Sequence, residues 1–174
     1  DYDVYRPCGR YCDIVTFNCY PFVDLTRNTC KVNRGSSIPV ADHFAKVAGL
    51  AGKPIMITEW SFMALDAGLP CSCGAGQRVM TQQERAQAAE VFLRQMLAMP
   101  GVVGWNYFRW IDQEPSGGSM YNREDCNYGL VNNRDEAYPI AETIGRLQND
   151  VYRFRNSQPL EEKPARPDPG PGKM

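Results

Sequence analysis

The sequence predicts an α/β fold in which helices cover a sheet of parallel strands. Three apolar or β-rich runs, at residues 13–21, 53–62 and 102–110, are each followed by a segment with apolar residues at helical spacing. The middle run, Lys-Pro-Ile-Met-Ile-Thr-Glu-Trp-Ser-Phe, has three consecutive apolar residues before a carboxylate, which is typical of a strand buried on both faces. This alternation of strands and helices indicates a repeated βα unit, which places functional residues at the carboxyl ends of the strands.

The first half of the chain is expected to contain two of the strands and one helix. Residues 1–12 are polar and aromatic, and they indicate the end of a helix or a connection. The first strand, residues 13–21, ends at a proline and leads into a polar loop over residues 22–37. A helix is expected over residues 38–50, because apolar residues recur there every three or four positions and glycines follow.

Two long loops dominate the second half. The loop at residues 61–80 is too long to be a mere connector, and such loops are usually functional or disordered. A helix over residues 81–99 is predicted to begin at a capping box, Thr-Gln-Gln-Glu. The third strand, residues 102–110, leads into a second long loop over residues 111–128. A final helix is expected over residues 137–154, with a proline where the first turn tolerates one.

The composition indicates an ordinary globular protein. The chain has 174 residues, of which 43% are hydrophobic and 22% charged, and its net charge is −1. This balance gives no reason to expect nucleic acid or a membrane as a partner, and no stretch approaches the ~20 apolar residues of a membrane span. Residues 1–155 are expected to form the folded part, and the proline-rich residues 156–174 a disordered tail.

The sequence contains an odd number of cysteines. They are Cys8, Cys12, Cys19, Cys30, Cys71, Cys73 and Cys126. Their spacings lack the paired C-x2-C pattern of a zinc site and His43 is the single histidine, so we expect no metal and no other cofactor. An odd count argues against a fully disulfide-bonded secreted module. A bridge from Cys71 or Cys73 to Cys126 stays open, because all three lie in predicted loops.

The three strand segments carry a resemblance to a known family. The residues at 13–21, at 53–62 and at 104–115 with Asn-Tyr-Gly-Leu-Val at 127–131 are similar to the sixth, seventh and eighth strands of retaining (β/α)8-barrel glycoside hydrolases. More narrowly, four further runs resemble the β-agarase-like family. They are Asp-Ala-Gly-Leu-Pro at 66–70, Gly-Ala-Gly at 74–76, Thr-Gln-Gln-Glu-Arg-Ala at 81–86 and Tyr-Pro at 138–139.

The resemblance covers roughly residues 10–155 and implies a partial (β/α)8 barrel, namely its last three βα units. It also implies a glycosidase acting on a β-linked polysaccharide such as agarose or a related galactan, in a secreted or periplasmic location. Where the agarase-like pattern has His-Trp-Phe on the last strand, this chain has Asn106-Tyr107-Phe108. That departure concerns the sugar specificity rather than the fold.

The resemblance makes Glu59, at the end of the seventh barrel strand, the catalytic nucleophile. A retaining glycosidase needs two carboxyl groups about 5–5.5 Å apart, of which the nucleophile must be ionised. Tyr20 and Arg109, at the ends of the flanking strands, are the expected donors that stabilise this charge. The structural alternatives are that Glu59 and Arg109 form ordinary ion pairs and that Tyr20 only caps the sheet.

Substrate contacts are expected from aromatic and polar residues near the same strand ends. Aromatic rings cover the apolar faces of sugars, and amides or carboxylates bind the hydroxyls. The candidate aromatic residues are Trp60, Phe108 and Trp110, and the candidate polar residues are Asn18, Asn106, Asp112 and Glu124. Each aromatic residue alone is as well explained by core packing, but their clustering near the strand ends favours a role in binding.

The second carboxyl group has no obvious candidate. In these barrels the acid/base glutamate follows an Asn, and no Asn-Glu dipeptide occurs in the sequence. The N-terminus shows neither a starting Met nor a signal-peptide pattern. We therefore expect the C-terminal part of a longer enzyme that needs its N-terminal barrel half and is inactive alone. The alternatives are a non-catalytic carbohydrate-binding or interaction module, and a small α/β domain unrelated to sugars.

Overall fold

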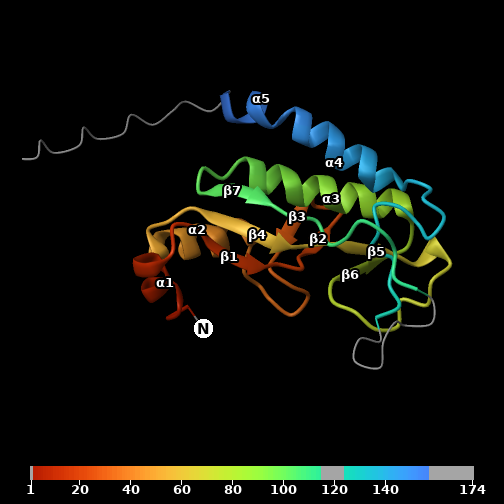
Figure 1. Ribbon diagram of the computed structural model, residues 1–174, viewed down its shortest axis with the longest axis horizontal. Coiled ribbons are helices and arrows are strands. Elements are labelled where there is room, and N and C mark those ends of the chain that lie inside the picture. The colour runs from red at the N-terminus through yellow and green to blue at the C-terminus, as the bar shows by residue number, and fades with distance from the viewer. Residues whose placement is uncertain (1, 115–123, 157–174) are drawn as a thin grey trace, which may run out of the picture.

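The computed structural model describes residues 2–114 and 124–156, which form a mixed α/β fold (Figure 1). Its centre is a three-stranded parallel sheet in the order β1–β4–β7, formed by Val15–Asn18, Ile55–Glu59 and Val102–Trp105. Because the strands are parallel, their carboxyl ends meet at one edge of the sheet. The predicted α/β class with parallel strands is confirmed.

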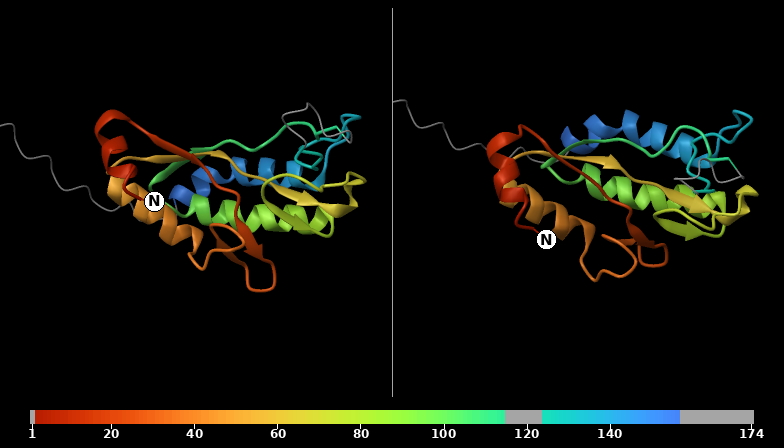
Figure 2. Two further views of the ribbon diagram at one scale, coloured as in Figure 1. Left: turned by 90° about the horizontal axis from the view of Figure 1, so that it is seen from below. Right: turned by 60° about the horizontal axis from the view of Figure 1, so that its bottom comes forward.

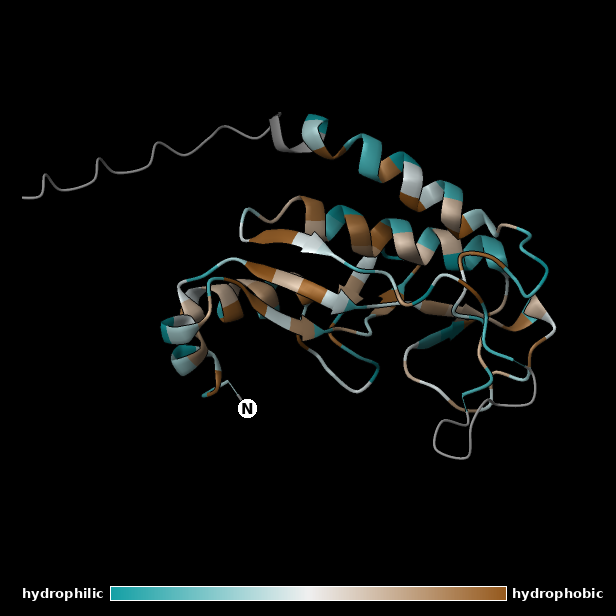
Figure 3. Ribbon diagram, viewed as in Figure 1, coloured by the Kyte–Doolittle hydropathy of each residue, from teal (hydrophilic) through white to brown (hydrophobic). Residues whose placement is uncertain are grey.

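The sheet is buried on one face only, in contrast to the expectation from the apolar run. Ile55 and Ile57 are fully buried in the main core, whereas Met56 on the opposite face is partly exposed. On the flanking strands Thr16 and Val103 are exposed in the same way. Figure 3 shows β4 changing from hydrophobic to hydrophilic towards its carboxyl end.

Three helices pack against the covered face of the sheet. They are α2 (Val40–Ala51), α3 (Gln82–Leu97) and α4 (Pro139–Asn149), and α3 lies between the other two (Figure 2). Glycine 52 ends α2 in the left-handed conformation, with φ of 62°. The predicted capping box at the start of α3 is confirmed, since the Thr81 hydroxyl accepts a hydrogen bond from the Glu84 amide and the Glu84 carboxylate accepts one from the Thr81 amide.

Two further helices lie near the ends of the described chain. The short helix α1 (Tyr5–Tyr11) occupies the N-terminal segment. The single final helix expected over residues 137–154 is interrupted at Asp150, and the second piece is α5 (Val151–Asn156). Within the described residues, no helix combines the length and the apolar character that crossing a membrane requires. The predicted tail lies outside these residues, apart from Asn156.

The two segments expected to be irregular contain short strands. In residues 22–37, β2 (Phe22–Asp24) and β3 (Thr29–Lys31) form an antiparallel hairpin. In residues 61–80, β5 (Phe62–Ala64) and β6 (Gln77–Val79) form a parallel pair, with the single-turn helix η1 (Leu65–Ala67) between them.

A side-chain contact between the two segments supports these short strands. The Gln77 side chain bonds both the N–H and the C=O of Val23, at 2.7 and 2.9 Å, and so joins the hairpin to β6. Gln77 and Val23 are far apart in the sequence, so a contact between them cannot be predicted from a local sequence pattern. The third predicted strand is shorter than expected, because β7 ends at Trp105 and residues 106–110 follow an irregular path.

Candidate active site

Glu59 lies at the carboxyl end of the central strand, with Tyr20 beside it. The Tyr20 hydroxyl donates a hydrogen bond to Glu59 Oε2 at 2.8 Å. Tyr20 follows β1, and the backbone of the two strands stays in contact here, since the Cys19 amide donates to the Glu59 carbonyl at 2.9 Å. The contact expected between Tyr20 and Glu59 from adjacent parallel strands is therefore present in the structure.

The environment of Tyr20 keeps its hydroxyl protonated, so that it can donate a hydrogen bond to Glu59. Burial, then the hydrogen bond to Glu59 and the charge of Glu59, raise the pKa of the Tyr20 phenol well above its ordinary value. The phenol therefore keeps its proton throughout the neutral range. Both side chains are only half-buried, so the carboxylate is held on one side by Tyr20 and stays accessible to solvent. This is the arrangement that a carboxylate acting on an external molecule needs.

Arg109 does not join this pair. Its guanidinium carbon lies 5.8 Å from the centre of the Phe108 ring, and its backbone bonds Tyr128 and Leu130. No hydrogen bond or ion pair connects Arg109 to Glu59 in the described part of the chain. The expected contact between them is not found, because the chain leaves the sheet after Trp105.

Two of the three predicted aromatic residues are partly or fully committed to packing. Trp60 is 0% exposed, and its ring centre lies 4.9 Å from that of Tyr107 and 5.2 Å from that of Phe92. Its assignment as a sugar-stacking residue is corrected, since a core side chain offers no face to a ligand. Phe108 is half-buried and packs edge-to-face with Tyr128, whereas Trp110 is 68% exposed.

The predicted polar contacts divide in a similar way. Asn18 and Asn106 are exposed, and Asn18 Oδ1 accepts a hydrogen bond from the Thr58 hydroxyl at 2.8 Å. Glu124 is partly exposed and accepts a hydrogen bond from Gln113 Nε2 at 2.7 Å. Asp112 is only 4% exposed and its oxygens are occupied by protein donors, so its assignment as a sugar contact is corrected.

Asp112 belongs to a buried polar cluster that the sequence analysis did not identify. We call it the Arg85–Asp112 network; its members are Arg85, Tyr107, Asp112, Asn127 and Tyr138. Asp112 accepts hydrogen bonds from the Asn127 amide at 2.8 Å, the Gly129 N–H at 2.7 Å and the Tyr138 hydroxyl at 2.7 Å.

Arg85 is the cationic member of the network and is fully buried. It donates to the Phe62 carbonyl at 2.7 Å, the Tyr107 hydroxyl at 2.7 Å and the Gly129 carbonyl at 2.9 Å. The burial of Arg85 could have been predicted from the sequence, because position 85 lies on the same helical face as the apolar positions 89, 92 and 96. A charge on an apolar face requires buried partners.

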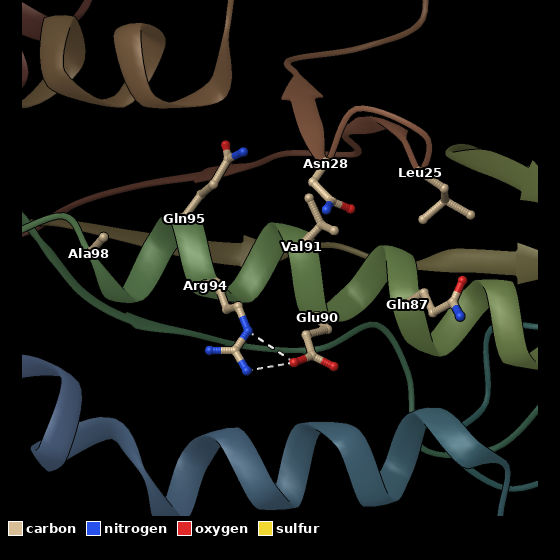
Figure 4. Close-up of a pocket in the computed structure, with 8 residues that line it drawn as sticks. All are labelled: Leu25, Asn28, Gln87, Glu90, Val91, Arg94, Gln95 and Ala98. Carbon is tan, nitrogen blue, oxygen red and sulfur yellow. Dashed lines mark hydrogen bonds and ion pairs between the residues drawn. The ribbon is translucent and has the colours of Figure 1, made fainter.

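A cavity of about 600 Å³ adjoins the Glu59–Tyr20 pair. Tyr20 lines it, together with the loop before α2 and the segment leading into β6. A second cavity, of about 610 Å³, lies on the outer side of α3 near the β2–β3 turn (Figure 4). Its charged residues, Glu90 and Arg94, pair with each other and face α4. The second cavity therefore has no connection with Glu59.

The cysteines in the described residues are all free thiols. The bridge left open by the sequence is not formed, and the Cys126 thiol instead donates to the Cys73 carbonyl at 2.6 Å. Within the same residues, no group of histidine, cysteine and acidic side chains is arranged to hold a metal ion.

The chain is similar to known proteins in both sequence and structure. No protein-family model matches the chain. Over 142 residues it is 29% identical to β-agarase A of Vibrio sp. (strain JT0107), which covers 81% of this chain and 14% of that protein. The structure of BpGH50 matches with a TM-score of 0.71 at 25% identity, over 90% of this chain and 29% of that one. The agarase AgWH50C matches with a TM-score of 0.70 at 26% identity, over 89% and 21%.

These matches confirm the resemblance inferred from the sequence. The chain is similar to β-agarase-like glycoside hydrolases both in sequence and in fold, and its mixed α/β structure corresponds to part of such a domain. It spans less than a third of the length of each of these three proteins.

Proposed function

We propose that this chain carries the nucleophile half of a retaining glycoside hydrolase site that cleaves a β-linked polysaccharide such as agarose or a related galactan. The observation that carries the proposal is the position of Glu59, at the carboxyl end of the central parallel strand with the Tyr20 hydroxyl 2.8 Å from Oε2. The β-agarase relatives support the substrate class.

The rest of the site is proposed to come from further strands of a (β/α)8 barrel. One face of the three-stranded sheet is open, as expected for strands whose second face turns into a barrel interior. Protonation of the leaving oxygen requires a second carboxylic acid. Because the sequence contains no Asn-Glu dipeptide, we assign this acid to the N-terminal half of a longer protein.

The proposed reaction begins with attack of the Glu59 carboxylate on the anomeric carbon. The acid protonates the departing oxygen, and a covalent glycosyl-enzyme forms that water then hydrolyses. The hydrogen bond from Tyr20 orients the carboxylate by holding Oε2 and leaves Oε1 for the attack. Because the Tyr20 phenol keeps its proton at neutral pH, this orientation does not depend on pH in that range.

Substrate binding is assigned to the exposed members of the predicted set. Trp110 is the most exposed aromatic residue of this set, and Phe108 and Arg109, which contact each other, are its neighbours along the chain. Asn18, Asn106 and Glu124 supply groups that can bind sugar hydroxyls.

The proposal is tested by Glu59→Gln in the full-length protein. We expect turnover on agarose-type oligosaccharides to fall by at least ~10⁴-fold, because an amide cannot form the covalent intermediate. Oligosaccharide binding, measured by calorimetry, should remain. Glu136→Gln is the matched control, since Glu136 is an exposed carboxylate on a surface turn. A Glu59→Gln protein that keeps more than a small fraction of the rate contradicts the assignment.

The division of the site is tested with residues 1–174 alone. We expect no hydrolysis of any β-linked galactan, because the acid typically contributes ~10²–10⁴-fold in rate. Activity of this chain alone, abolished by Glu59→Gln, would place the acid within it, with Glu114 and Glu124 the first residues to substitute. Glycan binding by the full-length protein without turnover would support the alternative of a non-catalytic carbohydrate-binding module.

A further inference from the structure

The cavity beside Tyr20 is lined by basic residues. Its volume of about 600 Å³ is within the range of pockets that hold small ligands, and Tyr20 joins it directly to Glu59. Two arginines, Arg34 and Arg78, line it from two different segments, and none of its lining residues is acidic. The inference drawn from this cavity concerns the substrate and rests on the proposed glycosidase function.

Arg34 lies on a well-defined turn between β3 and α2. The Asn33 side chain accepts a hydrogen bond from the Gly35 amide at 3.0 Å, and the Asn33 carbonyl accepts one from the Ser36 amide at 3.2 Å. The position of the Arg34 backbone is therefore set by its neighbours. The side chain is exposed and forms no ion pair with any described residue.

Arg78 is held from the opposite wall, at the centre of β6. Its Nε donates to the Cys71 carbonyl at 2.7 Å, and one terminal nitrogen donates to the Gly74 carbonyl at 3.4 Å. These partners orient the guanidinium but do not neutralise it, because carbonyls carry no net charge. In the described residues Arg78 has no carboxylate partner either. Two guanidinium groups thus line one cavity whose lining residues include no carboxylate.

Tyr20 and Gly76 bring this cavity close to the Glu59 site. Gly76 has φ of 104°, and a Cβ at this position would lie 3.2 Å from the Ser61 carbonyl oxygen and 3.3 Å from the Tyr20 ring. A side chain here would be strained and would press on the ring that bonds Glu59. The loop that carries Gly76 therefore packs closely against the Tyr20 ring, which both lines the cavity and bonds Glu59.

We propose that this cavity is a subsite for an anionic substituent, a sulfate ester or a carboxylate, on a sugar adjacent to the cleaved bond, and that Arg34 and Arg78 bind it. Guanidinium groups bind both anions through paired, charge-assisted hydrogen bonds. The chain therefore acts best on a charged galactan, and the two arginines determine this specificity.

The test compares substrates that differ only in charge, using the full-length protein. The probes are a neutral agarose-type oligosaccharide, the same backbone with sulfate esters, and the same backbone oxidised to carry carboxylates. We expect kcat/KM to be about tenfold or more higher on at least one charged probe, as for hydrogen bonds to charged groups. The two charged probes distinguish sulfate from carboxylate, and the preference should weaken as salt increases.

The variants separate a charge effect from a structural one. Arg34→Gln should remove most of the preference and leave the rate on the neutral probe unchanged, and Arg34→Lys should retain part of it. Arg78→Gln should act in the same direction. Arg27→Gln is the matched control, because Arg27 is 79% exposed on the β2–β3 turn and does not line the cavity.

Two results would overturn the proposal in distinguishable ways. Equal kcat/KM values on neutral and charged probes would contradict the anionic subsite and leave the glycosidase function intact. The same conclusion would follow if Arg34→Gln lowered kcat/KM equally on both kinds of probe. Failure to bind or cleave any of the three probes would remove the proposed function and the subsite together.

Discussion

Two buried or half-buried carboxylates of this protein, Glu59 and Asp112, have opposite environments. Asp112 accepts hydrogen bonds from a side-chain amide, a backbone N–H and a tyrosine hydroxyl, and it is sealed from solvent. Among the described residues, Glu59 accepts one side-chain hydrogen bond, from Tyr20, and it stays partly exposed. A saturated carboxylate stabilises the protein, whereas one with free acceptor capacity can act on another molecule.

The two regions also differ in what they connect. The Arg85–Asp112 network joins α3, the start of α4, β5 and the segment after residue 124, through Arg85, Tyr138, Asn127 and Gly129. The Glu59–Tyr20 pair joins only the ends of two neighbouring strands. We infer that the network supports the loops around the strand ends, and that the pair is the part available for chemistry. The following substitutions test this contrast.

Arg85→Met should have the largest effect on stability. It leaves the carbonyls of Phe62 and Gly129 and the Tyr107 hydroxyl without their donor in a buried place, which costs about 3–5 kcal/mol in the free energy of unfolding. Urea denaturation measures this loss. Arg94→Met on the same helix is the control, because its exposed ion pair with Glu90 contributes about 1 kcal/mol or less. An equal loss in the free energy of unfolding in both variants would contradict the prediction that Arg85 stabilises the buried network.

Asp112→Asn and Glu59→Gln should separate stability from activity. Asparagine keeps one acceptor oxygen and adds a donor that faces the donors already present, so we expect Asp112→Asn to lower the free energy of unfolding by about 2–3 kcal/mol. Glu59→Gln should change it by less than about 1 kcal/mol, since its carboxylate is half-exposed. Thermal and urea unfolding of both variants measure the difference. If Glu59→Gln were less stable than Asp112→Asn, the contrast between a structural Asp112 and an available Glu59 would be wrong.

Tyr20→Phe should reduce activity with little loss of stability. Removal of the hydroxyl takes away a hydrogen bond to a charged group, which corresponds to about a 10–100-fold loss in kcat. Tyr107→Phe is the matched control, because that hydroxyl accepts a hydrogen bond from Arg85 in the buried network. We expect Tyr107→Phe to lower stability rather than the rate per folded molecule. A Tyr20→Phe enzyme with the wild-type rate would show that the phenol does not orient Glu59.

The smallest effect is expected at His43 on α2, which belongs to neither the Glu59–Tyr20 pair nor the Arg85–Asp112 network. Burial and then the charge of Lys46 lower the pKa of His43 below 6.5. The unfolded chain therefore takes up a proton before the folded one, so the contribution of His43 to stability is complete above pH 6.5 and declines as pH falls towards the folded-state pKa. Proton NMR can follow the single histidine without assignment by mutation. A titration midpoint at or above 6.5 would contradict this expectation.

The order of the main elements and the place of Glu59 could be predicted from the sequence. The capping box at Thr81 and the strand that ends at Glu59 are local signals that the structure confirms. The apolar run before Glu59 is nevertheless buried on one face only, and the last predicted helix is interrupted at Asp150. The pairing of Tyr20 with Glu59 also follows from sequence, because neighbouring parallel strands bring their carboxyl ends together. Such features depend on residues close along the chain or on a regular rule of strand pairing.

Which residues near the strand ends are available to a ligand could not be predicted from the sequence, because this depends on how the chain packs. Trp60 and Trp110 are both aromatic and both lie near the end of a predicted strand, yet one is fully buried and the other 68% exposed. Asp112 became part of the scaffold because Asn127, Gly129 and Tyr138, distant in sequence, supply its donors. Burial depends on contacts between such distant segments, which no local pattern contains.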